Sequence, residues 1–218
     1  LMADLIELSA NDLAAMLCSR VCHDLINPVG AIGNGLEALS DPAQAEMAPF
    51  ARDLINNAAR QASAKLEYAR LAFGASSSAG TDIDTREGER VAKLLFAIEK
   101  ADLDWQVAPM LLPKNKAKLL MNMLLIAASA VPRGGLVTVE VSGDAGSERF
   151  RLTAKGPKTL IPSGAPDLIA GNPEEGVDAR GIQPFYTGLL GRMTGMGLKI
   201  GLEDETFVFT AEPVSAAA

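Results

Sequence analysis

The chain contains few of the residues that build metal sites, disulfide frameworks or aromatic cores. Its 218 residues include one histidine, two cysteines and only 5% aromatic residues. Cys18, Cys22 and His23 offer three clustered metal ligands, one fewer than structural zinc takes, so we expect no metal site. Two cysteines without a framework spacing are typical of a reducing cytoplasm. The core must therefore be built from small and aliphatic side chains, which favours closely packed helices.

Excess positive charge and long apolar runs are also absent. The net charge of -7 makes a poor match to a phosphate backbone, so nucleic acid is not an expected partner. No polybasic segment indicates a membrane surface. The longest apolar stretch, Leu119–Val131, is far shorter than the roughly 20 residues of a membrane span, and no signal peptide is recognisable. We therefore expect a cytoplasmic protein with no membrane partner.

Two segments near the N-terminus carry apolar residues at spacings of three and four, the pattern of amphipathic helices. The first spans residues 10–40 and the second residues 43–73. Asp41-Pro42 ends the first helix and opens the second, so the two helices form an antiparallel hairpin. Pro28 removes one backbone donor from the first helix. The apolar stripe of that helix consists of Leu17, Val21, Leu25, Val29, Ile32, Leu36 and Leu39.

A two-helix hairpin cannot enclose its own apolar stripe. Pairing with a second copy would bury the stripe in a four-helix bundle, so we expect a homodimer. The alternative is that the C-terminal part of the chain covers the stripe.

Beyond the hairpin the sequence pattern changes. Residues 74–86 are small and polar, the composition of a linker. Later segments predict helices and a mostly antiparallel sheet, which together make an α+β sandwich. We therefore expect two domains, the hairpin at residues 1–76 and the sandwich at residues 84–218. The predicted helices are residues 87–100, 114–131 and 179–194, and the predicted strands are residues 104–107, 136–142, 149–155, 199–202 and 206–211.

His23 is predicted to face away from the apolar stripe. At 100° per residue it lies on the opposite side of the first helix. Asn27, Gly30 and Asn34 share its face, and Arg20 lies at the margin. An exposed histidine on a polar face is usually only a solvated side chain, so its position alone assigns no function.

The neighbours of His23 suit phosphoryl chemistry. Imidazole is a good nucleophile near neutral pH, and its attack on phosphorus gives a labile phosphoramidate. Asp24 can hold one ring N–H, while Asn27, one turn later, can reach the same phosphoryl oxygens. Gly30 leaves room for the backbone of another protein. The predicted catalytic residues are His23, Asp24 and Asn27, and the predicted partner-binding residues are Arg20, Gly30 and Asn34.

Residues 20–33 read Arg-Val-Cys-His-Asp-Leu-Ile-Asn-Pro-Val-Gly-Ala-Ile-Gly. This segment resembles the H-box of two-component histidine kinases, with a phospho-accepting His, an adjacent acid, a polar residue four on and a Pro five on. The run His-Asp-Leu-Ile-Asn-Pro-Val-Gly-Ala-Ile is similar to the ChpT-type histidine phosphotransferases of alphaproteobacteria. The resemblance implies that His23 accepts phosphate and that a histidine-kinase-like, or GHKL-ATPase-like, α/β sandwich follows the hairpin.

The resemblance extends into the second domain, where the ATP-binding residues have been replaced. Lys118–Val139 resembles the N-box helix of a kinase, but Ile126 stands where kinases carry the asparagine that binds magnesium. Thr153–Lys158 resembles the box that recognises adenine, but Ala154 replaces its aspartate and Lys158 its last glycine. The resemblance therefore implies no ATP and no cofactor in this chain, with Mg²⁺ held by the partner receiver domain.

Together these features predict a histidine phosphotransferase of a two-component phosphorelay. His23 would accept phosphoryl from the phospho-aspartate of one receiver domain and pass it to another. The resemblance implies a CckA-like hybrid kinase as donor and CtrA-like and CpdR-like response regulators as recipients, in cell-cycle control. Two alternatives stay open, an ATP-dependent histidine kinase core and a non-catalytic dimeric docking scaffold.

Overall fold

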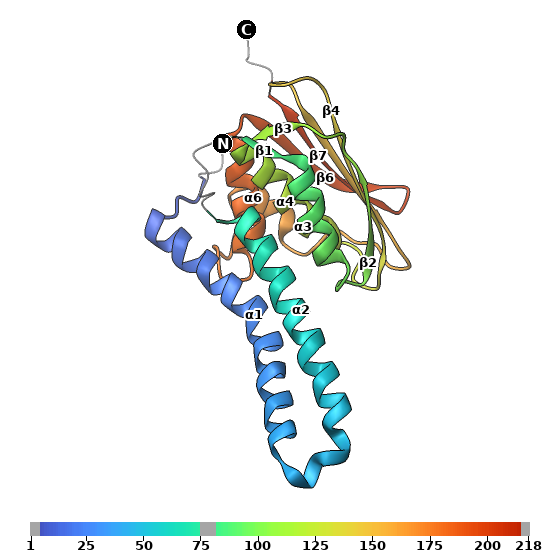
Figure 1. Cartoon of the computed structure of the whole chain (residues 1–218). Helices are drawn as coiled ribbons and strands as arrows, with labels where there is room; N and C mark the ends of the chain where they lie inside the picture. The colour runs from blue at the N-terminus through green and yellow to red at the C-terminus, as the bar shows by residue number, and fades with distance from the viewer. Residues whose placement is uncertain (1–4, 75–81, 215–218) are drawn as a thin grey trace.

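The first two long helices form an antiparallel hairpin that projects from an α/β body (Figure 1). The computed structural model describes residues 5–74 and 82–214. Helix α1 spans Ala10–Ser40 and α2 spans Ala48–Ala72, with the 3-10 turn η1 (Pro42–Met47) between them. The predicted hairpin is confirmed, although its second α-helix begins five residues late because the chain after Asp41 takes the tighter 3-10 geometry.

The body is a two-layer α+β sandwich, as predicted. Its five-stranded sheet has the order β2-β4-β5-β7-β6, in which β2 runs parallel to β4 and the other neighbours are antiparallel. A separate antiparallel pair joins β1 and β3. The elements are β1 Asp82–Asp84, α3 Thr85–Phe96, β2 Ala101–Gln106, β3 Leu111–Pro113, α4 Lys114–Ser129, β4 Gly135–Ser142, β5 Arg149–Lys155, α5 Ala165–Ala170, α6 Ile182–Met193, β6 Met196–Glu203 and β7 Thr206–Pro213.

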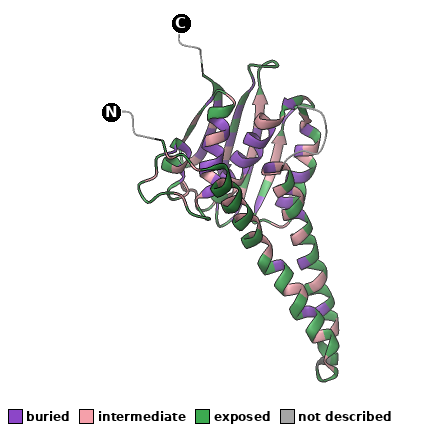
Figure 2. Ribbon diagram, turned by 90° about the vertical axis from the view of Figure 1, so that its left-hand side faces the viewer, coloured by how far each residue is buried: buried purple, intermediate pink, exposed green. Residues whose placement is uncertain are grey.

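The core lies between the sheet and the helices packed on it (Figure 2). Along β5, Phe150, Leu152 and Ala154 alternate with more exposed residues, as expected for a strand with one covered face. Phe207 and Phe209 of the neighbouring β7 meet edge to face, with ring centroids 6.4 Å apart. Helix α4 is buried along most of its length, which its apolar sequence predicts.

The predicted linker is wrong in its second half. Residues 75–81 lie outside the described residues, but Asp82–Asp84 pairs with β3 and Thr85 begins α3. The Asp84 carboxylate caps that helix by accepting from the Arg86 backbone N–H at 2.9 Å. Three elements were not predicted at all, β1, β3 and α5, because segments of three to six residues are too short to show a periodic pattern. The domain boundaries at 76 and 84 stay a prediction.

Buried polar contacts attach the hairpin to the body. The Tyr68 hydroxyl of α2 donates to the Met121 carbonyl at 2.7 Å, and the Asn122 side chain donates to the Ala72 carbonyl at 2.9 Å. Gln183 of α6 donates in turn to the backbone and side-chain oxygens of Asn122. Because each of these groups is buried, breaking one contact would leave an unsatisfied polar group. These hydrogen bonds therefore hold the body against the C-terminal end of α2.

One chain covers only part of the predicted apolar stripe. Helix α2 packs on the side of α1 that carries Pro28 and Gly35, the two buried residues of that helix. A Cβ on Gly35 would lie 2.6 Å from the Ile55 side chain, so glycine permits this close approach. The contact is therefore rotated from the centre of the stripe, and Val29 and Leu36 remain more than half exposed. No helix within the described ranges is long and apolar enough to cross a membrane.

Candidate functional site

His23 lies on the outward face of α1, as the sequence predicts. Its side chain is 74% exposed. Asn27, Gly30 and Asn34 are also exposed, whereas Arg20 is half-buried between the hairpin and the body. A Cβ on Gly30 would meet no atom within 4 Å, so the space above this turn is open to another molecule. The structure thus brings together the six predicted site residues along one side of α1.

Asp24 is bonded to Arg20 and not to the imidazole. One carboxylate oxygen, Oδ2, accepts from Arg20 Nε at 2.9 Å. The other, Oδ1, lies 3.7 Å from His23 Nδ1, beyond hydrogen-bond distance. The expected hydrogen bond from the ring N–H is therefore not formed here, because Arg20 is one helical turn away and competes for the carboxylate. Nδ1 nevertheless faces a negative charge, and Nε2 is the remaining ring nitrogen.

Lys65 of α2 is a site residue that the sequence did not single out. Its ammonium donates to the backbone carbonyl of Asp24 at 3.2 Å. Lys65 also lines a small cavity of about 120 Å³ together with Arg20, Asp24 and Glu99. The amphipathic pattern of α2 places a lysine there without showing what it contacts, because its partner is 41 residues away in the chain.

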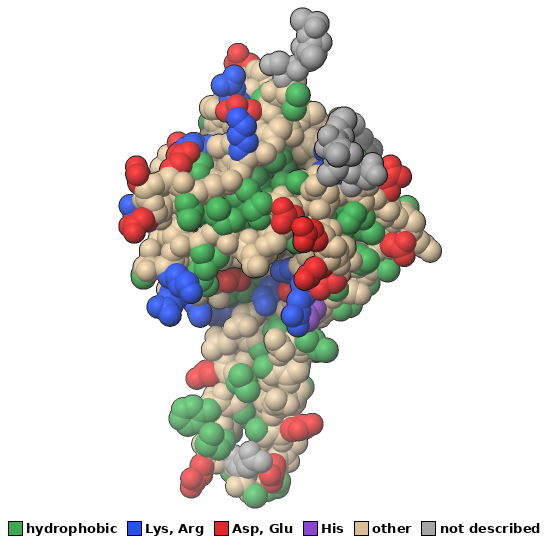
Figure 3. Space-filling view, turned by 180° about the vertical axis from the view of Figure 1, so that it is seen from behind, with side chains coloured by type: hydrophobic (Ala, Val, Ile, Leu, Met, Phe, Trp, Pro, Cys, Tyr) green, Lys and Arg blue, Asp and Glu red, His purple; other side chains and the backbone are tan. Residues whose placement is uncertain are grey.

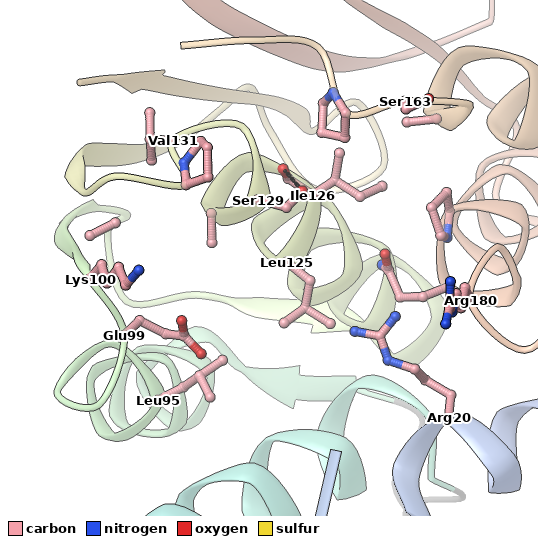
Figure 4. A pocket seen from close by; sticks show the side chains of 17 residues that line it. Arg20, Leu95, Glu99, Lys100, Leu125, Ile126, Ser129, Val131, Ser163 and Arg180 are labelled. Carbon is pink, nitrogen blue, oxygen red and sulfur yellow. Dashed lines mark hydrogen bonds between the residues drawn. The ribbon is translucent and has the colours of Figure 1, made fainter. Parts of the chain in front are cut away.

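A larger cavity of about 590 Å³ lies where α1 meets the body, next to Arg20 (Figure 4). Arg20 and Arg180 lie on one side of it, and Glu99 and Lys100 lie on the opposite side. Side chains of α4 form much of its apolar wall. Lys and Arg side chains gather on the surface where the hairpin meets the body (Figure 3). The cavity therefore combines an apolar wall with three cations, Arg20, Lys100 and Arg180, and one carboxylate, Glu99.

The positions that depart from the kinase pattern do not form one site. Ile126 lines the large cavity, whereas Ala154 is buried in the core and Lys158 is exposed. Asn122, four residues before Ile126, is fully buried and its amide is bonded to Ala72, Lys118 and Gln183. The nearest carboxamide on α4 is thus unavailable as a magnesium ligand.

Two glycines of α6 serve packing. The backbone of Ile169 in α5 runs directly against Gly188 of α6, at a distance that leaves no space for a Cβ. Gly191 likewise lies against the Leu198 side chain. These contacts explain why α6 carries small residues at these two positions.

The two cysteines lie beside the site but form no metal cluster. Both are exposed and one helical turn apart on α1. A hydrogen bond between the side chains raises the pKa of Cys22, and its repulsion by Cys18 adds to the effect. A thiol whose pKa is raised is a weaker nucleophile and metal ligand. Among the residues that the structure describes, no three His, Cys, Asp or Glu side chains converge as a metal site would require.

Comparison with known proteins identifies close relatives. The family model of the histidine phosphotransferase C-terminal domain matches residues 85–206. Protein phosphotransferase ChpT of Brucella abortus (strain 2308) is 49% identical over 208 residues, which cover 95% of this chain and 98% of that protein. The solved 1.7 Å structure of a bacterial phosphotransferase is 47% identical, with a TM-score of 0.89 over 96% of this chain and all of the other.

Proposed function

Since this chain belongs to the histidine phosphotransferase family and is a protein phosphotransferase, we propose that His23 carries the phosphoryl group from one receiver-domain aspartate to another. The observation that carries the proposal is the exposure of this single histidine beside the Arg20–Asp24 ion pair. A receiver can approach it without displacing any part of the hairpin.

The proposed transfer uses the nitrogen that points away from Asp24. His23 Nε2 attacks the phosphorus of the aspartyl phosphate, a P–N bond forms, and the P–O bond to the receiver breaks to release its carboxylate. Asp24 Oδ1 lies 3.7 Å from Nδ1 and offsets the positive charge that the ring gains. Donation reverses these steps on the second receiver. Mg²⁺ is held by the receiver in both halves.

The proposal includes no use of ATP by this chain. Ile126 has a hydrocarbon side chain at the sequence position where the kinase helix that it resembles carries its magnesium ligand. The amide of Asn122 is committed to buried hydrogen bonds. Both observations support a body that has kept its architecture as a support for the hairpin and as a second contact for receivers.

We also propose that the protein works as a cytoplasmic homodimer. The exposed apolar side chains of Val29, Leu36 and Phe50 support pairing of two hairpins into a four-helix bundle. The position of the large cavity beside Arg20 supports a receiver that touches the hairpin and the body together. A CckA-like hybrid kinase as donor, and CtrA-like and CpdR-like regulators as recipients, follow from the resemblance of residues 20–33.

Label transfer tests the proposal. Each protein is mixed with a receiver domain that carries radiolabelled phosphate on its aspartate, and label on each species is followed with time. We expect acid-labile label on the native chain and none on His23→Ala, whose fold is checked by circular dichroism. Lys93→Met, which removes an exposed ion pair with Glu89 on α3, outside the candidate site, serves as the control and should accept label.

The same experiment separates the alternatives. Label taken directly from ATP in the absence of a receiver would favour a kinase core. Binding of the receiver without any label on the native chain would favour a docking scaffold. Transfer retained by His23→Ala would place the acceptor elsewhere.

A further inference from the structure

Pro28 leaves one carbonyl of α1 without its helical donor, and that carbonyl belongs to the residue after His23. In an α-helix, the N–H of residue 28 would donate to the carbonyl oxygen of residue 24. Proline has no N–H, so this bond is missing although the helix continues through Pro28. The gap in the hydrogen-bond ladder therefore falls on Asp24.

A side chain from the other helix fills this gap. Lys65 Nζ of α2 donates to the Asp24 carbonyl at 3.2 Å, and the contact is partly buried. Arg20 meanwhile donates to the Asp24 carboxylate at 2.9 Å. Two cations thus hold Asp24 from two directions, one at its backbone and one at its side chain.

We infer that Lys65 is a positioning residue for phosphoryl transfer: by donating to the carbonyl that Pro28 leaves open, it fixes the turn of α1 that presents Asp24 to His23. The inference rests on the proposed role of His23. It assigns to Lys65 no contact with the phosphoryl group, since its bond is to the backbone of Asp24.

The geometry shows why this bond matters for the reaction. Asp24 Oδ1 is 3.7 Å from His23 Nδ1, so a small rotation of this turn would change how the carboxylate faces the ring. A backbone carbonyl without a partner in a half-buried place also favours local unwinding of the helix. Loss of alignment at a reacting group lowers the rate of the chemical step more than it lowers binding.

A double-mutant cycle between Lys65 and Pro28 tests the inference. In Pro28→Ala, the new N–H can donate to the Asp24 carbonyl, so the Lys65 bond becomes redundant. The variants are Lys65→Met, Pro28→Ala and the double variant, with Lys93→Met as a control because its exposed ion pair with Glu89 lies on α3. The measured quantities are the rate constant of phosphoryl acceptance at saturating phospho-receiver and, separately, the half-saturating concentration.

We expect Lys65→Met to lower the saturated rate by roughly tenfold when Pro28 is present, the effect of losing one charged hydrogen bond at the reacting group. Half-saturation should barely change, and Lys65→Arg should restore most of the rate. In the Pro28→Ala background, Lys65→Met should cost less than about twofold, because the helix supplies its own bond.

Equal losses in both backgrounds would overturn the inference, since they would assign Lys65 to general packing. An unchanged rate in Lys65→Met would also overturn it. If Lys65→Met does not fold, a folded double variant still supports the inference, and an unfolded double variant contradicts it. Failure of the native chain to accept phosphoryl is a different result, which would refute the proposed function itself.

Discussion

Replacing Val29 with glutamate tests the proposed dimer at a position where the single chain should tolerate the change. Val29 is 57% exposed on α1, and Leu36 and Phe50 on the same hairpin are 53% and 68% exposed. A substitution at an exposed site usually changes the free energy of unfolding by less than about 0.5 kcal/mol. In a four-helix bundle, however, the same carboxylate would be taken out of water without a cation.

The expected loss of dimer stability in Val29→Glu follows from the two-fold symmetry of the interface. Burying an unpaired charge costs about 3 kcal/mol or more, and a two-fold interface contains the substitution twice. The dimer should therefore lose about 6 kcal/mol, which at 1.4 kcal/mol per tenfold is a weakening of roughly 10⁴-fold. Val29→Glu should be a folded monomer at concentrations where the native protein is a dimer.

Light scattering over a range of protein concentrations measures the oligomeric state of each variant, and circular dichroism confirms that each variant is folded. The matched control is Leu111→Glu, because Leu111 is 60% exposed but lies on β3 of the body. A native protein that is monomeric throughout, or a Val29→Glu variant that stays dimeric, would refute the reasoning.

Three further predictions concern partner access, ATP and stability. Gly30→Trp should abolish transfer while melting like the native chain, because a Cβ there meets no atom of its own chain within 4 Å and the side chain would obstruct a receiver; normal transfer would contradict this. Calorimetry with millimolar ATP and magnesium should show no saturable binding, and saturable binding would favour the kinase alternative. Burial raises the pKa of Glu148, but the 2.5 Å bond from Lys116, hydrogen bonds from the backbone and the Lys116 charge together leave that pKa below its ordinary value. Lys116→Met should therefore cost about 3 kcal/mol at neutral pH. The difference in stability between Lys116→Met and the native chain, measured by thermal unfolding, should shrink below about pH 4.3, the ordinary pKa of glutamate. The ion pair is lost there because Glu148 takes up a proton.

The regular elements of the fold were predictable because their patterns are long. Helix α1 begins and ends where the periodicity does, and β5 matches its predicted bounds, Arg149–Lys155. The elements that were not predicted are short or do not alternate apolar and polar residues. The sequence did not specify which side of α1 would meet α2, and the structure places α2 on the side of Pro28 and Gly35 and leaves Val29 exposed.

The residues of the candidate site were predictable in identity but not in their bonds. A helical wheel places His23 outward and Asn27 beside it, because both follow from 3.6 residues per turn. The wheel does not show which neighbour will bond to Asp24. In the structure, the Asp24 carboxylate accepts a hydrogen bond from Arg20. That choice depends on side-chain rotamers and on the body, which partly covers Arg20.

By itself, the sequence determined the longer helices and strands and the chemical character of one helix face, since both depend on residues close together in the chain. It also determined that the Asp24 carbonyl would lack a helical donor, because Pro28 has no N–H. Only the tertiary structure decided that Lys65 would replace that donor, and that the body would enclose a cavity beside Arg20. These contacts join residues 41 or more positions apart in the chain. No local sequence pattern specifies which distant side chains will meet when the helices pack.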